Sequence, residues 1–289
     1  MCHPDYSTSQ ICNQNNGSCT CKNTQTLFGR TCDYCGPNCK GKFFTPNFAF
    51  YHFQISCNQT FYFAVKQFLV VGGEGVKATE VLDFSNSNLT KPSFGVIPET
   101  QSYAVGAYLN DQPIICGGAD SSSLKKYDTC LTFDNSRWSQ THKLTTRRTW
   151  AASVLLNETT LWILGGVGDL DSTELINANE ENGIPGKELP LAMRGMCAVK
   201  YSSEKIFVIG GYSNGNWLDS AWIFNPKNNF NYITGPSLKK ERYDHGCALM
   251  KNGQNYLIVV GGGYGNGNYR SSVEILDPSN DNNQWTQGK

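Results

Sequence analysis

Two consecutive glycines end an apolar, β-rich run at five places in the chain. The pairs are Gly72-Gly73, Gly117-Gly118, Gly165-Gly166, Gly210-Gly211 and Gly261-Gly262, the last followed by Gly263. Their first members lie 45, 48, 45 and 51 residues apart. This period is too long for a hairpin and fits a four-stranded sheet, so the sequence predicts one structural unit repeated five times.

Each unit can be divided into four strands. A run of small residues forms the first strand (151–156, 197–201 and 247–250), and the strand that ends in Gly-Gly is the second. Third strands begin at Glu80, Thr129, Glu174, Trp222 and Glu274. An aromatic residue marks the fourth strand in every unit but the third: Phe94, Trp138, Phe230 or Tyr232, and Trp285. The prediction is an all-β fold.

The glycine pairs have a conformational interpretation. Glycine tolerates positive φ and close approach of another group, so each pair predicts a bulge against which an aromatic ring of the neighbouring unit packs. The first pair could also be mistaken for a phosphate-binding loop. No amphipathic helix follows any pair, so nucleotide binding is not expected.

These features together resemble a kelch-repeat β-propeller. Besides Gly-Gly, the chain has Asn225-Pro226 and Asp277-Pro278 after third strands, and Arg147, Arg194 and Arg242 leading into the next unit. The resemblance runs from about residue 60 to the end. It implies four-stranded blades around a central channel, here five recognisable blades of an incomplete six- or seven-bladed ring that is truncated at the C-terminus.

Charge and apolar patterning limit the partners. Lys and Arg total 24, Asp and Glu total 24, and the net charge is 0, so no basic surface favours nucleic acid. The most apolar stretch, residues 61–71, is interrupted by Lys66 and Gln67 and is too short to span a bilayer. We expect neither a nucleic-acid partner nor a membrane segment in this chain.

The N-terminal residues are rich in cysteine instead of core-forming residues. Eight of the 12 cysteines lie in the first 57 residues: Cys2, Cys12, Cys19, Cys21, Cys32, Cys35, Cys39 and Cys57. Disulfides or a metal must replace a hydrophobic core there. Zinc held by Cys19, Cys21, Cys32 and Cys35 is the alternative to disulfides, although the spacing fits no zinc finger well.

The cysteine spacing in this segment resembles a laminin-type EGF-like module. That resemblance implies a Cys21–Cys32 disulfide, and pairing of Cys35 with Cys39 or Cys57. We therefore predict two domains, an EGF-like module at residues 1–45 and a propeller at 46–289, as in attractin-type proteins. Disulfides persist in oxidising surroundings, so a secreted or extracellular location is expected, even though no signal peptide follows Met1 and the chain is expected to be a fragment.

Four cysteines lie within the repeats. A hairpin centred on Ser123 would place Cys116 directly opposite Cys130, which predicts a cross-strand disulfide. Cys197 and Cys247 occupy equivalent positions in adjacent units. We expect these two to be buried thiols, because equivalent positions in adjacent blades are not hydrogen-bonded neighbours.

Glycosylation sequons occur at four asparagines. They are Asn16, Asn58, Asn88 and Asn157. Asn157 is the best candidate, because it lies in the predicted turn between Leu156 and Leu161.

Residues for catalysis are scarce. The chain has four histidines, and a copper site of the galactose-oxidase kind needs a His pair with two Tyr, one of them linked to Cys. Asp244 and His245 beside Arg242 lack a nucleophile, so we interpret them as structural. The sequence predicts no catalytic residues, cofactor or metal.

The most informative candidate site lies in the loops between second and third strands, which gather on one face of a propeller. Tyr212, Trp217, Tyr264 and Tyr269 place aromatic rings among Asn and Gly in two of these loops, suited to a protein or glycan ligand unless they simply pack under the loops. The sequence thus favours a non-catalytic extracellular binding module. An oxidase whose active-site blade is missing and an intracellular adaptor for ubiquitin ligation are the alternatives.

Overall fold

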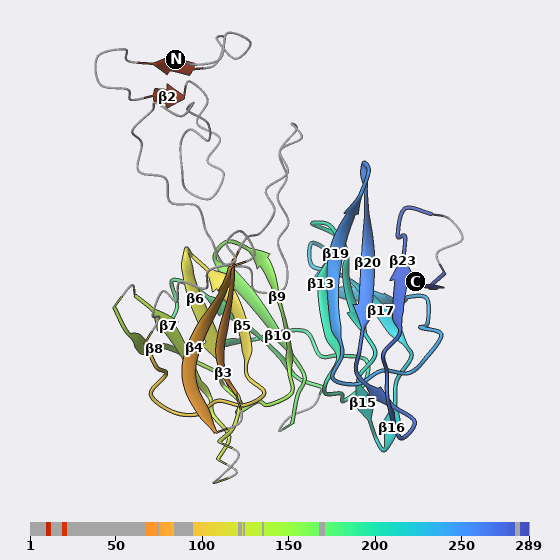
Figure 1. Ribbon diagram of the computed structural model, residues 1–289, viewed down its shortest axis with the longest axis horizontal. Coiled ribbons are helices and arrows are strands. Elements are labelled where there is room, and N and C mark those ends of the chain that lie inside the picture. Colours follow the sequence, from red (N-terminus) through yellow and green to blue (C-terminus); the bar gives the residue numbers. More distant parts are fainter. Residues whose placement is uncertain are drawn as a thin grey trace. The chain divides into compact units, whose positions relative to one another are not determined.

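The computed structural model describes residues 10–12, 19–21, 67–73, 75–83, 95–120, 123, 125–134, 136–167, 171–280 and 284–288. The chain divides into two compact units, Met1–Pro46 and Asn47–Lys289. All regular elements in these residues are β-strands (Figure 1). The expected all-β class is therefore confirmed for the part that is described.

The first unit contributes one hairpin to the description. Strand β1 (Gln10–Cys12) pairs antiparallel with β2 (Cys19–Cys21), and Cys12 lies opposite Cys19. The predicted partner of Cys21, Cys32, lies outside the described residues, as do the sequons at Asn16, Asn58 and Asn88. The EGF-like module therefore stays a prediction.

Four antiparallel sheets of four strands follow one another in the second unit, each in simple sequence order. Sheet II contains β5 (Val105–Leu109), β6 (Gln112–Cys116), β7 (Thr129–Phe133) and β8 (Trp138–Lys143). Sheet III contains β9 (Ala152–Asn157), β10 (Thr160–Leu164), β11 (Thr173–Asn177) and β12 (Ile184–Pro185). Sheet IV contains β13 (Cys197–Lys200), β14 (Ile206–Ile209), β17 (Ala221–Asn225) and β18 (Asn231–Thr234). Sheet V contains β19 (Gly246–Asn252), β20 (Asn255–Gly261), β23 (Val273–Leu276) and β24 (Thr286–Gln287).

The first predicted unit is described only in part, as sheet I. Strands β3 (Gln67–Gly73) and β4 (Val76–Asp83) are its second and third strands. An isolated bridge between Ala78 and Val96 adds the start of a fourth. Sheets II to V thus have four strands each, as expected. Sheet I has two strands and a bridge within the described residues.

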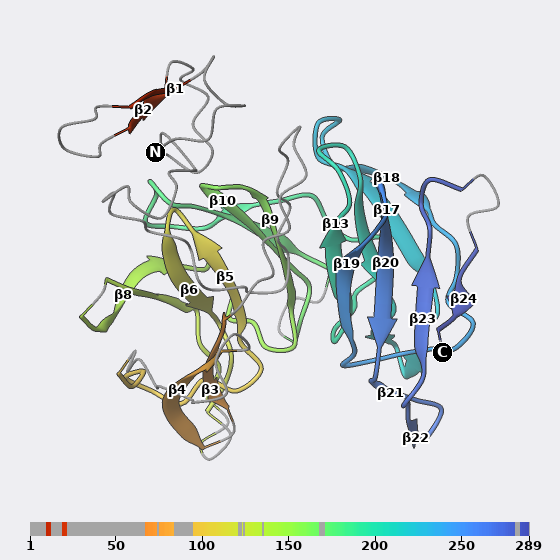
Figure 2. The same cartoon turned by 45° about the horizontal axis from the view of Figure 1, so that its top comes forward.

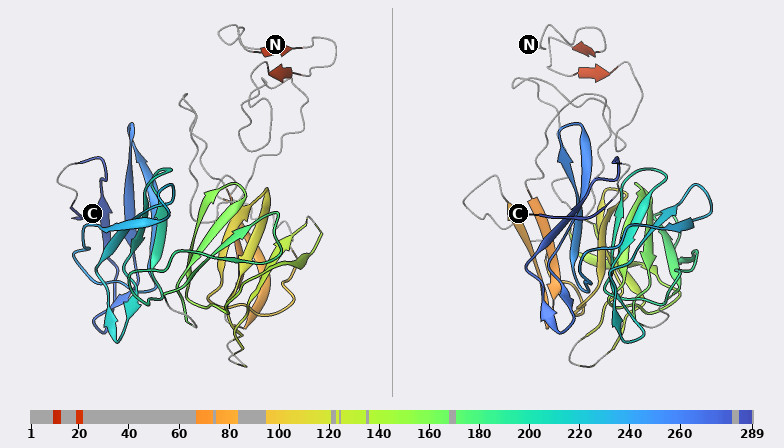
Figure 3. Two further views of the ribbon diagram at one scale, coloured as in Figure 1. Left: turned by 180° about the vertical axis from the view of Figure 1, so that it is seen from behind. Right: turned by 90° about the vertical axis from the view of Figure 1, so that its right-hand side faces the viewer.

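Successive sheets are joined by apolar side chains. Strand β6 shows the pattern, because Ile114 packs with Leu161 of sheet III while the next residue, Ile115, packs with Leu69 of sheet I. Strands buried on both faces read as continuous apolar runs, which accounts for the sequence before each glycine pair. First strands lie next to one another in turn, with β5 beside β9, β9 beside β13 and β13 beside β19. Sheets IV and V, coloured teal to blue, lie side by side in the left view of Figure 3.

The glycine pairs are required by close contact with the backbone of the loop before the next sheet, and not by packing of an aromatic ring as expected from the sequence. Gly117 and Gly118 have φ of 68° and 88°, and a Cβ on Gly117 would lie 2.5 Å from the carbonyl oxygen of Arg148. The Gly118 N–H donates to that same oxygen at 2.7 Å. The pair therefore lets the loop before the next sheet come into backbone contact, which a side chain would block.

The fifth pair is Gly262-Gly263, one residue later than the predicted Gly261-Gly262. Gly261 belongs to strand β20 and pairs with Gly246 and Val273. Gly262 and Gly263 have the positive φ values, 74° and 88°, and a Cβ on Gly263 would lie 2.7 Å from the carbonyl oxygen of Tyr243. With three consecutive glycines, the sequence does not show which of them ends the strand.

Two disulfides join strands of the second unit. Cys116 and Cys130 are opposite each other in register and form the bond expected from the sequence, with a Cα–Cα distance of 4.0 Å. Cys197 and Cys247 also form a disulfide, with a Cα–Cα distance of 6.0 Å, so the expectation of two thiols was wrong. First strands of neighbouring sheets approach closely without hydrogen bonds, and about 6 Å is a common Cα spacing for a disulfide.

Candidate functional site

Two short hairpins extend from the loops between second and third strands of sheets IV and V. One is β15 (Tyr212–Ser213) with β16 (Asn216–Trp217), and the other is β21 (Tyr264–Gly265) with β22 (Asn268–Tyr269). We call them the fingers; β15 and β16 are labelled in Figure 1 and β21 and β22 in Figure 2. They bring together two of the predicted binding loops.

Both fingers have the same sequence pattern, Tyr-x-Asn-Gly-Asn-aromatic. Their central residues have positive φ, 47° and 85° at Asn214 and Gly215, and 48° and 77° at Asn266 and Gly267. These are the values that a type I′ turn requires, which Asn-Gly favours. In each finger the second Asn donates its amide N–H to the first Asn carbonyl, at 3.1 and 3.0 Å.

The four predicted aromatic residues lie in one continuous line across the fingers. Tyr212 pairs with Trp217 and Tyr264 pairs with Tyr269, with ring centroids 6.1 and 5.2 Å apart. Trp217 also meets Tyr264 at 5.9 Å, which joins the two fingers, and Tyr212 meets Tyr243 at 5.8 Å. We call these five residues the aromatic ladder.

Exposure differs along the ladder. Tyr269 is 89% exposed, whereas Tyr212, Trp217 and Tyr264 are half-buried, chiefly among their ladder neighbours. The contacts between these rings agree with the packing interpretation, and the ligand-binding interpretation stays a prediction. The rings support one another and still present an aromatic surface to solvent.

Beside the ladder, the loops before each first strand carry a second feature. Equivalent residues Tyr103, Trp150, Gly195 and Asp244 all have positive φ, between 52° and 60°. Each N–H donates to the carbonyl oxygen of the preceding residue of the set, with N···O distances of 3.1 Å at Trp150, 2.8 Å at Gly195 and 2.9 Å at Asp244. This amide chain joins sheets II to V, and no sequence pattern indicates it, because three of the four residues are not glycine.

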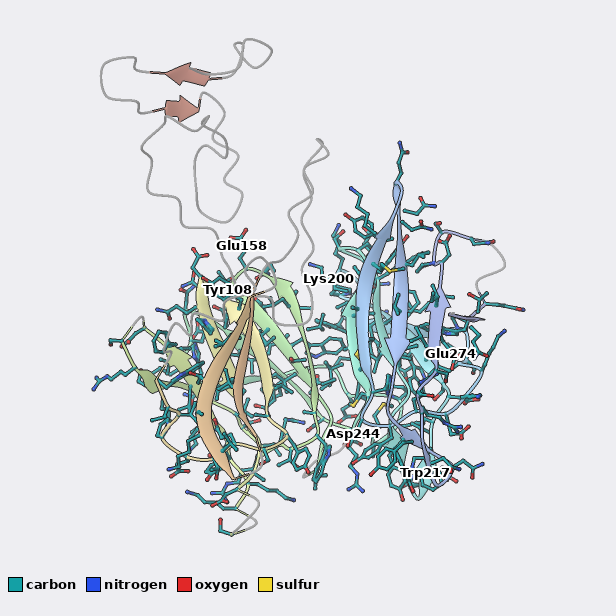
Figure 4. All side chains as sticks on the ribbon, viewed as in Figure 1. Tyr108, Glu158, Lys200, Trp217, Asp244 and Glu274 are labelled. Carbon is teal, nitrogen blue, oxygen red and sulfur yellow. A yellow bond between two sulfur atoms is a disulfide. The ribbon has the colours of Figure 1, made fainter. Side chains whose placement is uncertain are left out.

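The side chains of this set form a polar and aromatic cluster. Tyr103 stacks on Trp150 with centroids 3.9 Å apart, and the Trp150 indole N–H donates to Asp244 Oδ2 at 3.1 Å. Burial raises the pKa of Asp244, and hydrogen bonds from Trp150 and Tyr243 oppose the shift. Burial and the Asp244 charge raise the pKa of Tyr243 to about 12. Asp244 and Trp217 lie at the same end of the sheets in Figure 4.

Buried ion pairs fix the loops that carry this cluster. In sheet III, Arg148 Nε donates to Glu174 Oε1 at 2.8 Å, and Arg148 Nη1 donates to the Gly165 carbonyl at 3.0 Å. In sheet V, Arg242 contacts Glu274 and the Gly262 carbonyl in the same way, at 3.2 and 2.8 Å. All four charged side chains are nearly inaccessible.

Two of the three arginines predicted to lead into the next unit have other roles. The buried arginine of sheet III is Arg148, because Arg147 is exposed and faces Asp128. In sheet IV the equivalent position holds Met193, whose core cluster includes Trp222 at the position of the glutamate. Arg194 is the next residue, and its guanidinium lies over the Tyr212 ring, 5.1 Å from the centroid.

The remaining predicted residues occupy separate places. Asn157 ends β9 in an exposed turn, where its Oδ1 accepts from the Thr159 N–H at 2.9 Å, so the sequon is accessible. His245 is buried, and neither of its ring nitrogens has a hydrogen-bond partner among the described residues. Burial, with the Arg242 charge, lowers its pKa to about 4. Across the described residues, no three His, Cys, Asp or Glu side chains gather as metal ligands, and no helix there has the length and apolar character to cross a bilayer.

Four-stranded sheets with adjacent first strands and Gly-Gly links are the arrangement of a β-propeller. The Kelch motif matches residues 193–229 and 242–289, most of sheet IV and all of sheet V. The solved structure of YjhT is similar in fold, with a TM-score of 0.58 and 11% sequence identity over 78% of this chain and 84% of that one. No curated protein matches the sequence.

Proposed function

We propose that this chain is a non-catalytic extracellular binding module whose fingers contact a protein or a glycan. The observation that carries the proposal is the aromatic ladder. Four of its five rings lie on two hairpins that belong to none of the four-stranded sheets, and partly exposed Tyr and Trp are among the residues that most often anchor contacts.

The extracellular location is supported by the two disulfides, since such bonds persist in oxidising compartments. For the same reason an intracellular ubiquitin-ligase adaptor is disfavoured. The proposal includes an EGF-like module before the propeller, in an attractin-like arrangement, and a ring of six or seven blades when complete. An oxidase is the other alternative, and buried His245, whose ring has no hydrogen-bond partner in the described part of the chain, offers it no support.

The test compares ladder variants with a control on arrays of glycans and extracellular proteins. Trp217→Ala and Tyr264→Ala should fold and be secreted like the wild type but lose ligand capture. Tyr232→Ala is the matched control, because Tyr232 is an aromatic residue on β18 that is 40% exposed and outside the ladder. Loss of secretion in the ladder variants, or capture equal to that of the control, would refute the proposed surface.

A further inference from the structure

Arg194 differs from the other arginines near it. Four of the six described arginines have a carboxylate partner: Arg147 with Asp128, Arg148 with Glu174, Arg242 with Glu274, and Arg270 with Glu241. Arg194 has no carboxylate oxygen within 4.0 Å among the described residues. Its Nε is buried and has no hydrogen-bond partner there.

The position of Arg194 is fixed against the first finger. The backbone N–H of Arg194 donates to the Tyr212 carbonyl at 3.1 Å, and the backbone N–H of Tyr212 donates to the Arg194 carbonyl at 2.8 Å. The guanidinium lies on the Tyr212 ring, 5.1 Å from its centroid. A guanidinium held on a ring face keeps its planar edge of N–H donors, which matches a carboxylate in two parallel hydrogen bonds.

Asp244, the acidic residue of this cluster whose charge interacts with Arg194, already has hydrogen-bond partners. Asp244 accepts hydrogen bonds from Trp150 and Tyr243, and the Arg194 charge only opposes the rise that burial causes in the pKa of Asp244. The Glu241 carboxylate pairs with Arg270. Arg194 therefore presents a cation that contacts no carboxylate of the described residues, beside the half-buried rings of the aromatic ladder.

We propose that Arg194 binds a carboxylate of an acidic peptide segment in a protein partner, while Trp217 and Tyr264 contact apolar side chains of that segment. This inference rests on the proposed function. It favours a peptide over an acidic sugar, because successive ladder rings meet edge to face at interplanar angles of 61° to 69°. Such rings do not form a flat platform for a sugar chain, whereas Tyr, Trp and Arg together are typical anchors of protein contacts.

Peptide display can test the charge preference directly. Random phage-displayed peptides would be selected on the whole chain as wild type, Arg194→Gln and Arg194→Lys. Arg137→Gln is the control, because Arg137 is another arginine with no ion pair among the described residues. We expect Asp or Glu to be enriched at one position for wild type and Arg137→Gln but not for Arg194→Gln. Changing that acid to its amide in a synthetic peptide should weaken wild-type binding about tenfold and binding to Arg194→Gln very little.

Three results would overturn the proposal. They are selected peptides without acidic preference, an acid-to-amide change with the same effect on wild type and Arg194→Gln, and no selected peptides at all. Arg194-dependent binding of polygalacturonate without peptide binding would assign the site to an acidic glycan instead. The proposed function has a separate readout, because Trp217→Ala should abolish binding of acidic and neutral ligands alike. If Arg194→Gln fails to fold, Arg194→Lys keeps the charge and should bind the same peptides more weakly.

Discussion

At the scale of single residues, sheets III and V place a charged pair where sheet IV has an apolar pair. Glu174 accepts from the backbone N–H groups of Thr145 and Thr146 as well as from Arg148. A buried ion pair is tolerated when its remaining donors and acceptors are satisfied in this way. Met193 and Trp222 occupy the same positions in sheet IV without these bonds, and this substitution leaves the following Arg194 beside the fingers.

A second residue-scale feature predicts a pH dependence. His245 is buried with no partner for either nitrogen in the described structure, and its pKa is lowered to about 4. Because the folded pKa lies below the unfolded value of about 6.5, the unfolded chain binds more protons between these values. The free energy of unfolding should fall as the pH drops from about 6.5 towards 4, by up to about 3 kcal/mol from this residue.

Chemical denaturation at several pH values compares wild type with His245→Leu. Carboxylates titrate in both proteins, so the difference between their pH profiles isolates the imidazole. The variant should lose less stability on acidification. Parallel profiles would show that the pKa of His245 is the same in the folded and unfolded protein, which contradicts the prediction.

At the scale of elements, the fingers depend on their Asn-Gly turns. Gly215 has φ of 85° and an added Cβ would meet nothing within 4 Å, so Gly215→Val introduces backbone strain without a clash. A left-handed conformation costs a side-chain-bearing residue about 1 to 2 kcal/mol. Amide hydrogen exchange across residues 212–217 should accelerate, while the melting temperature of the sheets changes little.

Gly253→Val is the matched control for this experiment. Gly253 has φ of 61°, lies in the turn between β19 and β20, and also has open space around it. The control should accelerate exchange only in its own turn. Equal protection of residues 212–217 in Gly215→Val and wild type would mean that the ladder contacts, and not the turn, hold the finger.

Elements whose signals are local could be predicted from the sequence. The second strands carry apolar runs that end in glycine, and the Cys116–Cys130 bond lies within one hairpin, so both follow from residues close in the chain. Four of the five ladder aromatics, all but Tyr243, were also predicted, although their contact across the two fingers was not. Gly261 was misassigned because three glycines in a row leave the strand end undefined by pattern.

Features that depend on how sheets meet could not be predicted. Tyr103, Trp150 and Asp244 adopt positive φ without being glycine, and only the amide chain between neighbouring sheets makes that conformation favourable. Cys197 and Cys247 are 50 residues apart, and their contact depends on the approach of β13 and β19. The lack of a carboxylate partner for Arg194 among the described residues depends on where side chains of several sheets lie, and not on its neighbours in sequence.

At the scale of the whole second unit, three kinds of link join one sheet to the next besides apolar packing. The second glycine of a pair donates its N–H to the loop before the next sheet, as Gly211 does to Arg242 at 2.7 Å. The amide chain through Trp150, Gly195 and Asp244 runs across sheets II to V. The Cys197–Cys247 disulfide is the covalent link, between sheets IV and V.

The two disulfides should therefore differ in what their removal changes. Closing a longer loop restricts the unfolded chain more, so Cys197→Ser with Cys247→Ser, separated by 50 residues, should cost about 4 kcal/mol, and Cys116→Ser with Cys130→Ser, separated by 14, about 3 kcal/mol. The first change should also weaken the contact between sheets IV and V, seen as faster amide exchange in β13 and β19. The second should affect β6 and β7 alone, because both of its cysteines belong to sheet II. Exchange that is unchanged in β13 and β19, with a smaller loss of stability than in the sheet II variant, would show that apolar packing and the amide chain hold sheets IV and V together without the disulfide.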